Sequence, residues 1–300
     1  MGKAAKIWII VAAVLLIGGL TVCFTSASVN GNGFTELCTV KYQTTNHKIT
    51  DSFDSIAFDT KTSDIRFLPA DDGQCKVVCY EEENIRHTVK VESGTLTVTA
   101  VDTREWYDHV GINSNTPKIT VYLPLGEYNS LNIRNSTGDI EICQEFEFDN
   151  FDIRASTGDI TVENITADEM SLSVSTGHID AKNITCDGSL TVTVSTGKSL
   201  LRDITCETFT TEGNTGALTM TNVVASDSFN IIRTTGDVNF IGCDAAAVFI
   251  DTDTGDVSGT FLTGKSFVTE TSTGDIILPD SSGGECRIKT STGDVNIDIK

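Results

Sequence analysis

The sequence predicts an all-β fold: a right-handed parallel β-solenoid with coils of 19 to 20 residues, preceded by one N-terminal transmembrane or signal-anchor helix. Three observations lead to this prediction. A Thr-Gly pair recurs at nearly constant spacing, the residues around each pair alternate between apolar and polar, and a long uncharged segment lies near the N-terminus. Recurrence at a fixed period is typical of repeat architectures, in which each coil packs on its neighbours.

Nine Thr-Gly pairs between residues 130 and 300 follow one another in steps of 19 or 20 residues. The sharp corner of a coil needs a backbone with positive φ, which glycine adopts without steric cost. The Thr before the glycine and the Asp that often follows can hydrogen-bond local backbone amides. We therefore interpret the pair as a structural turn, and the turn glycines are Gly138, Gly158, Gly177, Gly197, Gly216, Gly236, Gly255, Gly274 and Gly293.

The residues on both sides of each pair have the period of a β-strand with one buried face. Around Thr157, for example, Phe151 and Ile153 precede the turn and Ile160 and Val162 follow it, with polar residues between them. Such alternation places every second side chain on the same face. Stacked parallel coils then align equivalent positions into ladders about 4.8 Å apart, and parallel crossovers are right-handed.

A second turn repeats within the copies, as "ENITAD", "KNITCD", "RDITCE" and "TNVVAS". Cys186 and Cys206 occupy one slot of adjacent coils, where a ladder would separate their Cβ atoms by about 4.8 Å, wider than a disulfide normally allows. We interpret them as buried thiols rather than as a bridge. The apolar residues at the third position of each turn are expected to point inward: Ile165, Ile184, Ile204 and Val223.

The pattern also divides the chain into segments. In the N-terminal half, "TSDI" at Thr62–Ile65 takes the corner slot of a degenerate coil, and Ser93-Gly94 forms the turn of a hairpin. At the C-terminus, we expect Asp298 and Lys300 to discourage pairing between molecules.

The predicted segments are a basic cytoplasmic stretch (1–6), a membrane helix (7–24), a flexible tether (25–33), an N-terminal cap with irregular first coils (34–129) and the regular solenoid (130–300).

The uncharged run Ile7–Phe24 is long enough to cross a membrane. As a helix it would measure about 27 Å, close to the thickness of a bilayer core. Lys3 and Lys6 precede it, and the positive-inside rule then places the rest of the chain outside the cytoplasm. We expect a single-pass protein of the cell membrane with an extracytoplasmic C-terminal domain. A signal peptide cleaved after Ala27 is the alternative.

The charge balance limits the partners. Asp and Glu number 42 against 21 Lys and Arg, for a net charge of -21. So acidic a chain repels nucleic acid phosphates, and we expect no nucleic acid partner. We also expect no cofactor. Ca²⁺ is the alternative, because consecutive turns stack carboxylates that attract a cation, along a ladder of Asp237, Asp256, Asp275 and Asp294.

The sequence lacks the usual signatures of catalysis, such as a nucleophile elbow, a phosphate loop or a zinc motif. The four histidines are far apart along the chain. Cys75 and Cys79 share one face of a predicted strand, but further metal ligands do not cluster near them, and core packing explains the pair. We predict a protein that is not an enzyme and has no catalytic residues.

The segment "ITVYLPLGEYNSLNIRNSTGDIEI" and the recurrent "STGDI" resemble a bacterial putative-adhesin domain family of unknown function. The resemblance spans about residues 50–300, and the repeat spacing is its specific part. It implies a right-handed β-helix-like repeat behind one N-terminal membrane segment, in the envelope of Gram-positive bacteria. It implies no catalytic residues.

Together these observations predict a non-catalytic, membrane-tethered extracytoplasmic β-solenoid that acts as an adhesin or as a binding or scaffold protein of the cell envelope. Its partners would be the membrane, through the N-terminal helix, and a protein or glycan ligand on the flat ladder faces. Two alternatives stay open. One is a carbohydrate-active enzyme on a β-helix, which needs acid–base residues clustered on one face. The other is a regulatory partner in envelope-stress sensing.

Overall fold

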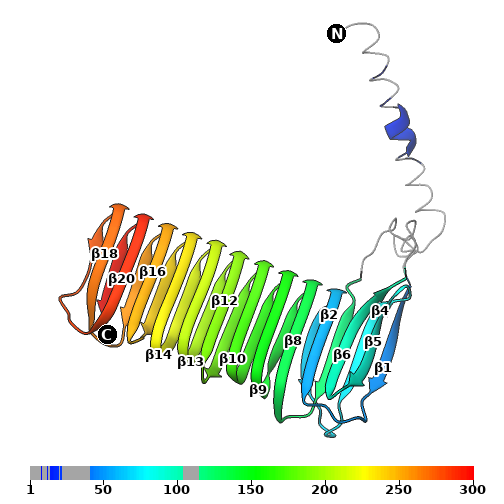
Figure 1. Cartoon of the computed structure of the whole chain (residues 1–300). Coiled ribbons are helices and arrows are strands. Elements are labelled where there is room, and N and C mark those ends of the chain that lie inside the picture. Colours follow the sequence, from blue (N-terminus) through cyan, green and yellow to red (C-terminus); the bar gives the residue numbers. More distant parts are fainter. Residues whose placement is uncertain (1–7, 9–11, 13, 20, 22–40, 104–114) are drawn as a thin grey trace. The chain divides into compact units, whose positions relative to one another are not determined.

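The computed structural model describes residues 8, 12, 14–19, 21, 41–103 and 115–300. The chain divides into two compact units, and the larger, Gln43–Asp102 with Thr116–Lys300, is a stack of β-strands (Figure 1). This confirms the predicted all-β fold with solenoid-like stacked coils. The predicted span 7–24 and the tether 25–33 lie largely outside the described residues. Among those that are described, no helix is long and apolar enough to cross a membrane.

The strands carry the whole architecture of the larger unit. In chain order they are β1 (Tyr42–Lys48), β2 (Ser55–Thr62), β3 (Asp64–Pro69), β4 (Lys76–Glu82), β5 (Ile85–Glu92), β6 (Thr95–Asp102), β7 (Lys118–Leu123), β8 (Glu127–Thr137), β9 (Ile140–Thr157), β10 (Ile160–Thr176), β11 (Ile179–Cys186), β12 (Ser189–Thr196), β13 (Ser199–Thr215), β14 (Leu218–Thr235), β15 (Val238–Cys243), β16 (Ala247–Thr254), β17 (Val257–Phe261), β18 (Lys265–Thr273), β19 (Ile276–Ile277), β20 (Gly284–Thr292) and β21 (Val295–Ile299).

Parallel pairing places equivalent residues of successive coils side by side, as the period predicts. Phe151 of β9 aligns with Met170 of β10, which aligns with Leu190 of β12, and Phe209 of β13 aligns with Phe229 of β14. All five are buried in one continuous apolar core. The period-two pattern therefore does set which side chains face inward, and burial of these rows is the main favourable term for the stack.

The Thr-Gly corner leaves no room for any other residue than glycine. The nine turn glycines have φ between +127° and +153°. A Cβ added at any of them would lie 1.7–2.3 Å from a backbone carbonyl oxygen of the neighbouring coil. Both the positive φ and the close approach of two backbones thus require glycine.

The second corner uses asparagine for the same purpose. Its corner residue has φ near +60°, a left-handed conformation that Asn and Asp tolerate better than most residues. The side chains also bond along the stack, since Asn183 Nδ2 donates to Asn164 Oδ1 at 2.6 Å. The corner residues are Asn164, Asn183, Asp203, Asn222 and Gly242. The apolar residues that follow, Ile165, Ile184, Ile204 and Val223, are buried as predicted.

At the C-terminal end the spatial order of the coils differs from the chain order. β20 pairs with β16 on one side and with β18 on the other, and β21 likewise lies between β17 and β19 (Figure 1). The last coil in space is therefore β18–β19 rather than the coil that ends in Asp298 and Lys300. That these two residues discourage pairing between molecules stays a prediction. The inner coil contributes the fully buried Ile288 and Val295, whereas Ile276 of the outer coil is 42% exposed.

The N-terminal end has a similar exchange. The coil β2–β3 lies between β6–β7 and β8–β9, all parallel, with Thr62 aligned with Thr137 and Ile65 with Ile140. This confirms "TSDI" as a corner, with Ser63 in the place of glycine. The β5–β6 hairpin turns at Ser93-Gly94, both with positive φ, as predicted. β4 then runs antiparallel to β7, and β1 pairs with β4 at the outer edge of this end.

Two single glycine-to-alanine substitutions test whether the Thr-Gly corner requires glycine. We expect Gly216→Ala to lower the free energy of unfolding by about 3 kcal/mol, because its Cβ would lie 1.7 Å from Gly197 O in a positive-φ conformation. Gly126→Ala, where nothing lies within 4 Å of the added Cβ, is the control and should change it by less than about 0.5 kcal/mol. Urea unfolding of both variants measures this, and equal effects would contradict the account.

Candidate functional site

A regular surface lies on the strands that precede the Thr-Gly corners. We call their outward side chains the outer ladder face. Two rows run across the coils in register, the first made of Asn132, Asp152, Ser171, Thr191, Thr210, Asn230 and Phe249, the second of Arg134, Arg154, Ser173, Thr193, Glu212, Ile232 and Asp251. Over β10, β12 and β13 most of these positions carry hydroxyl groups. The face therefore offers hydrogen-bonding groups at the spacing of the strands, about 4.8 Å.

A shallow cleft of about 320 Å³ lies on this face where β8, β9 and β10 approach their corners. Arg134 and Arg154 line it from adjacent coils in direct register, beside the hydroxyls of Ser156, Ser173 and Ser175. Arg154 Nε also pairs with Asp152 Oδ1 at 3.1 Å. Asp59, in register with Arg134, also lines the cleft. The two guanidinium groups offer donors to an anionic or polar group of a ligand.

The predicted Asp ladder has a structural task in the stack. In space its order is Asp237, Asp256, Asp294 and Asp275, because the last two coils are exchanged. Each Oδ1 accepts the backbone N–H of the next Asp, at 2.8–3.1 Å. The carboxylates therefore bond the amide of the neighbouring coil rather than a local one. His178 takes the same role, since its Nδ1 accepts the N–H of Lys198 at 3.0 Å.

A buried polar cluster in the N-terminal cap was not predicted from the sequence. Cys79, Glu81 and His87 are all buried, and their ligand atoms lie within 4.8 Å of one another. Glu81 Oε2 lies 2.9 Å from His87 Nδ1 and also accepts the N–H of His87. Our expectation that further metal ligands do not cluster near the Cys75–Cys79 pair is wrong. Alternate residues of β4 and the tight turn into β5 bring the three side chains together, and that spacing is the signal that could have indicated it.

The same cluster includes a hydroxyl next to the histidine. Ser63 Oγ lies 3.4 Å from His87 Nε2, which resembles the serine–histidine–carboxylate order of activated nucleophiles. However, the single hydroxyl proton of Ser63 is donated to Thr62 O at 2.7 Å, and Ser63 is fully buried. A nucleophile must give that proton to the histidine and must reach its substrate. This arrangement therefore does not support catalysis.

The family comparison agrees with this repeat architecture. A family model described as Toastrack DUF4097 matches residues 53–241 and 185–300. The chain belongs to the Toastrack DUF4097 family. A comparison with the curated proteins gave no match.

Several solved structures are similar to this Toastrack chain at low sequence identity. One is described as a putative adhesin from Bacteroides fragilis: 17% identity, covering 86% of this chain and 97% of that one, with a TM-score of 0.49. A second, a putative adhesin from Parabacteroides merdae, has 15% identity, 74% and 97% coverage and a TM-score of 0.46. A third, described as a putative lipid binding protein from Parabacteroides distasonis, has 15% identity, 87% and 97% coverage and a TM-score of 0.37.

The cysteines of the Toastrack unit are free thiols. Of the nine in the chain, the structure describes seven, and none of these forms a disulfide. Cys186 and Cys206 are buried, which confirms their interpretation as core residues. Burial raises the pKa of the Cys206 thiol to about 12 and that of Cys186 to about 11. These thiols are therefore protonated and unreactive at neutral pH.

Two basic residues are buried inside the solenoid, where the pattern predicts apolar ones. Arg233 donates from Nη2 to Thr211 Oγ1 at 2.9 Å, and burial lowers its pKa to about 10. Gly213 of the adjacent coil makes room for it, since a Cβ there would lie 1.8 Å from Nη1.

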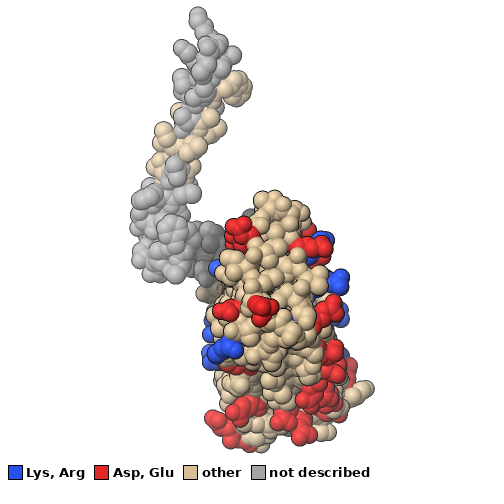
Figure 2. Space-filling model, turned by 90° about the vertical axis from the view of Figure 1, so that its left-hand side faces the viewer, with Lys and Arg blue, Asp and Glu red and all other residues tan. Residues whose placement is uncertain are grey.

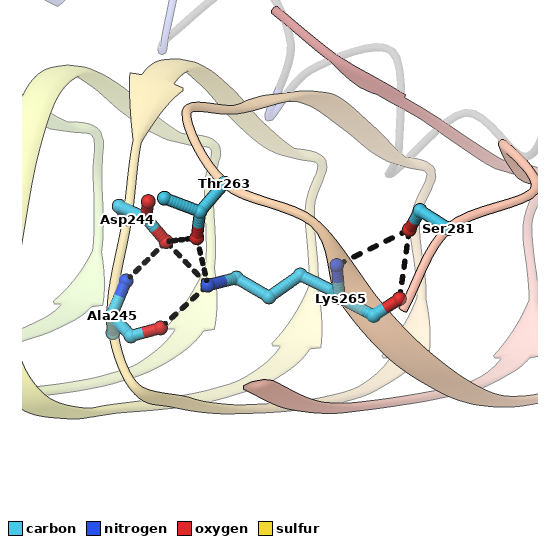
Figure 3. Close-up of polar contacts among 5 residues, drawn as sticks. All are labelled: Asp244, Ala245, Thr263, Lys265 and Ser281. Carbon is cyan, nitrogen blue, oxygen red and sulfur yellow. Dashed lines mark hydrogen bonds and ion pairs between the residues drawn. The ribbon is translucent and has the colours of Figure 1, made fainter. Parts of the chain in front are cut away.

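Lys265 is the second buried base, at the start of β18 (Figure 3). Its Nζ pairs with Asp244 Oδ1 and donates to Ala245 O at 2.7 Å and to Thr263 Oγ1 at 3.0 Å. Its backbone N–H and C=O are both bonded to Ser281 Oγ. Every proton of the ammonium group thus has an acceptor, and the residue ties the outermost coil to the coil of β15.

The region around the β18 end carries little positive charge. Figure 2 looks onto this end, where acidic side chains predominate over basic ones around largely uncharged surface. The buried Lys265–Asp244 pair adds nothing to that surface. It therefore serves stability rather than recognition.

A conservative pair of substitutions tests the Asp ladder. Asp256→Ala should lower the free energy of unfolding by about 1 kcal/mol, because the N–H of Asp294 loses its acceptor. Asp256→Asn keeps an acceptor oxygen and should stay close to wild type. We expect the melting temperature in about 1 mM Ca²⁺ to equal that in a chelator. A calcium-dependent rise that Asp256→Asn abolishes would show that the ladder also binds the cation.

The buried ion pair gives a separate test. Lys265→Met should lower the free energy of unfolding by about 3 kcal/mol, because it leaves Asp244 buried without its counter-ion. Combining it with Asp244→Asn should recover part of that loss. Lys289→Met, which breaks the exposed pair with Asp251 at 3.9 Å, is the control, with an effect within about 0.5 kcal/mol. Thermal unfolding measures all three, and equal effects of the two Lys→Met variants would contradict the role given to Lys265.

Proposed function

We propose that this Toastrack protein is a non-catalytic binding or scaffold protein of the cell envelope, and that it holds a protein or glycan ligand on the outer ladder face. The observation that carries this proposal is the register of that face. Equivalent outward side chains, such as Ser171, Thr191 and Thr210, align from coil to coil. A repeated row of hydroxyls suits a ligand that is itself repetitive, such as a glycan or an extended peptide.

The rigidity of the face supports the same proposal. Each strand of the face is hydrogen-bonded on both sides, and its inward residues belong to the continuous core. A preformed surface loses little conformational entropy when it binds, which favours affinity. The cleft at Arg134 and Arg154 would take the anionic or most polar group of the ligand.

We further propose that the chain is tethered to the cell membrane by Ile7–Phe24, with the solenoid on the extracytoplasmic side. The support is the length of that uncharged run and the position of Lys3 and Lys6 before it. This arrangement would present the solenoid to ligands of the envelope, or to a partner in envelope-stress sensing.

The test is a binding screen of the full-length chain against purified cell walls, isolated membranes and a glycan array. We expect specific binding to at least one envelope fraction. Thr193→Arg, a bulky charge in the middle of the outer ladder face, should weaken that binding at least tenfold. Thr221→Arg is the matched control, because Thr221 is an equally half-buried outward threonine of β14 beyond the Thr-Gly corner.

Two results would overturn the proposal. One is equal binding by the Thr193 and Thr221 variants, which would place the ligand elsewhere. The other is cleavage of a glycan by the wild-type chain, which would favour the alternative of a carbohydrate-active enzyme. Capture of a membrane protein with no retention on walls would favour the regulatory partner instead.

A further inference from the structure

We infer that Cys79, Glu81 and His87 form a binding site for one divalent transition metal ion of the Zn²⁺ class inside the N-terminal cap. A thiol, a carboxylate and an imidazole are the ligand types that Zn²⁺ takes from proteins. Their ligand atoms lie within 4.8 Å of one another, and all three residues are buried. The inference is independent of the ligand proposed for the outer ladder face.

The hydrogen bonds around His87 point to the ring nitrogen that would hold the metal. Nδ1 is directed at Glu81 Oε2, 2.9 Å away, so this nitrogen and the carboxylate face the same small space. Nε2 lies on the far side of the ring, 3.4 Å from Ser63 Oγ. A metal ion bound to Nδ1 would take the place of the proton shared with Glu81, and Nε2 would keep a hydrogen directed at Ser63.

The spacing between the nitrogen and the oxygen needs little adjustment to accept a metal. With metal–ligand bonds of about 2.0–2.1 Å in a tetrahedral site, the nitrogen and the oxygen would stand roughly 3.3 Å apart. The contact of 2.9 Å would open by only a few tenths of an ångström. Cys79 Sγ supplies the third ligand from the same face of β4. The fourth position would be filled by water or by a small movement of a neighbouring oxygen.

The partners behind the ligands are already in place. Glu81 Oε1 accepts the hydroxyl of Thr45 at 2.8 Å, and Oε2 accepts the N–H of His87 at 2.6 Å. Ser63 holds the far nitrogen of the imidazole ring. Such outer partners fix ligand orientation and tautomer in metal sites.

The ligands can balance the charge of the ion. Cys79 would bind the metal as a thiolate and His87 as a neutral imidazole, and the protons that these atoms release would leave to water. The carboxylate of Glu81 and the thiolate of Cys79 then offset the two charges of the dication, so the cap takes on no unpaired charge, which would be costly in this buried place.

A metal here would join elements that pack only weakly as strands. β4 and β5 share a single registered residue pair, Glu82 with Ile85, whereas Cys79 and Glu81 lie on β4 and His87 on β5. Thr45 and Ser63 bring in β1 and the first corner of the solenoid. The ion would therefore clamp the cap onto the first coil, and because the ligands are buried it would enter as the cap folds.

The experiment uses the full-length chain in detergent, unfolded in reductant and refolded with Co²⁺, with Zn²⁺ or with a chelator. We expect one equivalent of Co²⁺, a thiolate-to-cobalt charge-transfer band, displacement by Zn²⁺, and a higher melting temperature with either metal. Cys79→Ala should lose the band and bind Co²⁺ on the order of 100-fold more weakly. Cys75→Ala removes a buried thiol of the same segment outside the cluster, and it should behave as the wild type.

The wild-type result alone decides the main point, even where a variant folds poorly. Failure of the refolded wild type to bind a stoichiometric metal, or binding without a thiolate band, would overturn the inference. An unchanged band in Cys79→Ala would do the same. His87→Asn is the second ligand variant and should also weaken Co²⁺ binding, without loss of the β-sheet circular dichroism signal.

Discussion

The distance between neighbouring coils is the constraint on which the rest of this Toastrack structure depends. Parallel strands pair about 4.8 Å apart, so the backbones of successive corners must approach just as closely. A Cβ at Gly177 would lie 1.9 Å from Gly158 O, and equivalent contacts recur along the stack. The glycine repeat is therefore a consequence of stacking. It keeps the coils close enough for the inward rows to form one core.

Each coil also satisfies the polar groups of the next. Asp159 Oδ1 accepts the N–H of His178 in the next coil, and Asn183 Nδ2 donates to Asn164 Oδ1 of the coil before it. Corner side chains thus hydrogen-bond both the backbone and the side chains of neighbouring coils. Both bonds lie at exposed corners, so each contributes modestly, and their recurrence from coil to coil adds to the hydrogen bonds of the strands. The result is a regular stack whose outer ladder face is open to solvent, while the coils at its two ends lack a neighbour on one side.

The two end coils, which lack a neighbour on one side, are stabilised by different contacts. At the N-terminal end, β4 runs antiparallel to β7, and the cluster of Cys79, Glu81 and His87 connects β4 to β5. At the other end, the chain inserts β20 between β16 and β18, and Lys265 ties the outermost coil inward. Ends of a repeat stack lack a neighbour on one side, so they depend on such specific contacts more than interior coils do.

The sequence by itself determined the repeat, the corners and the buried rows, because each is a local consequence of strand period and glycine conformation. Phe151, Ile165 and Gly158 occupy the places that the period alone assigns to them. The exchange of the last two coils, the burial of Lys265 and the cap cluster needed the tertiary structure. They depend on which coils lie side by side, and a period of 19 or 20 residues is equally compatible with either order. His87 likewise meets Glu81 through a turn whose side-chain contacts have no repeat to reveal them.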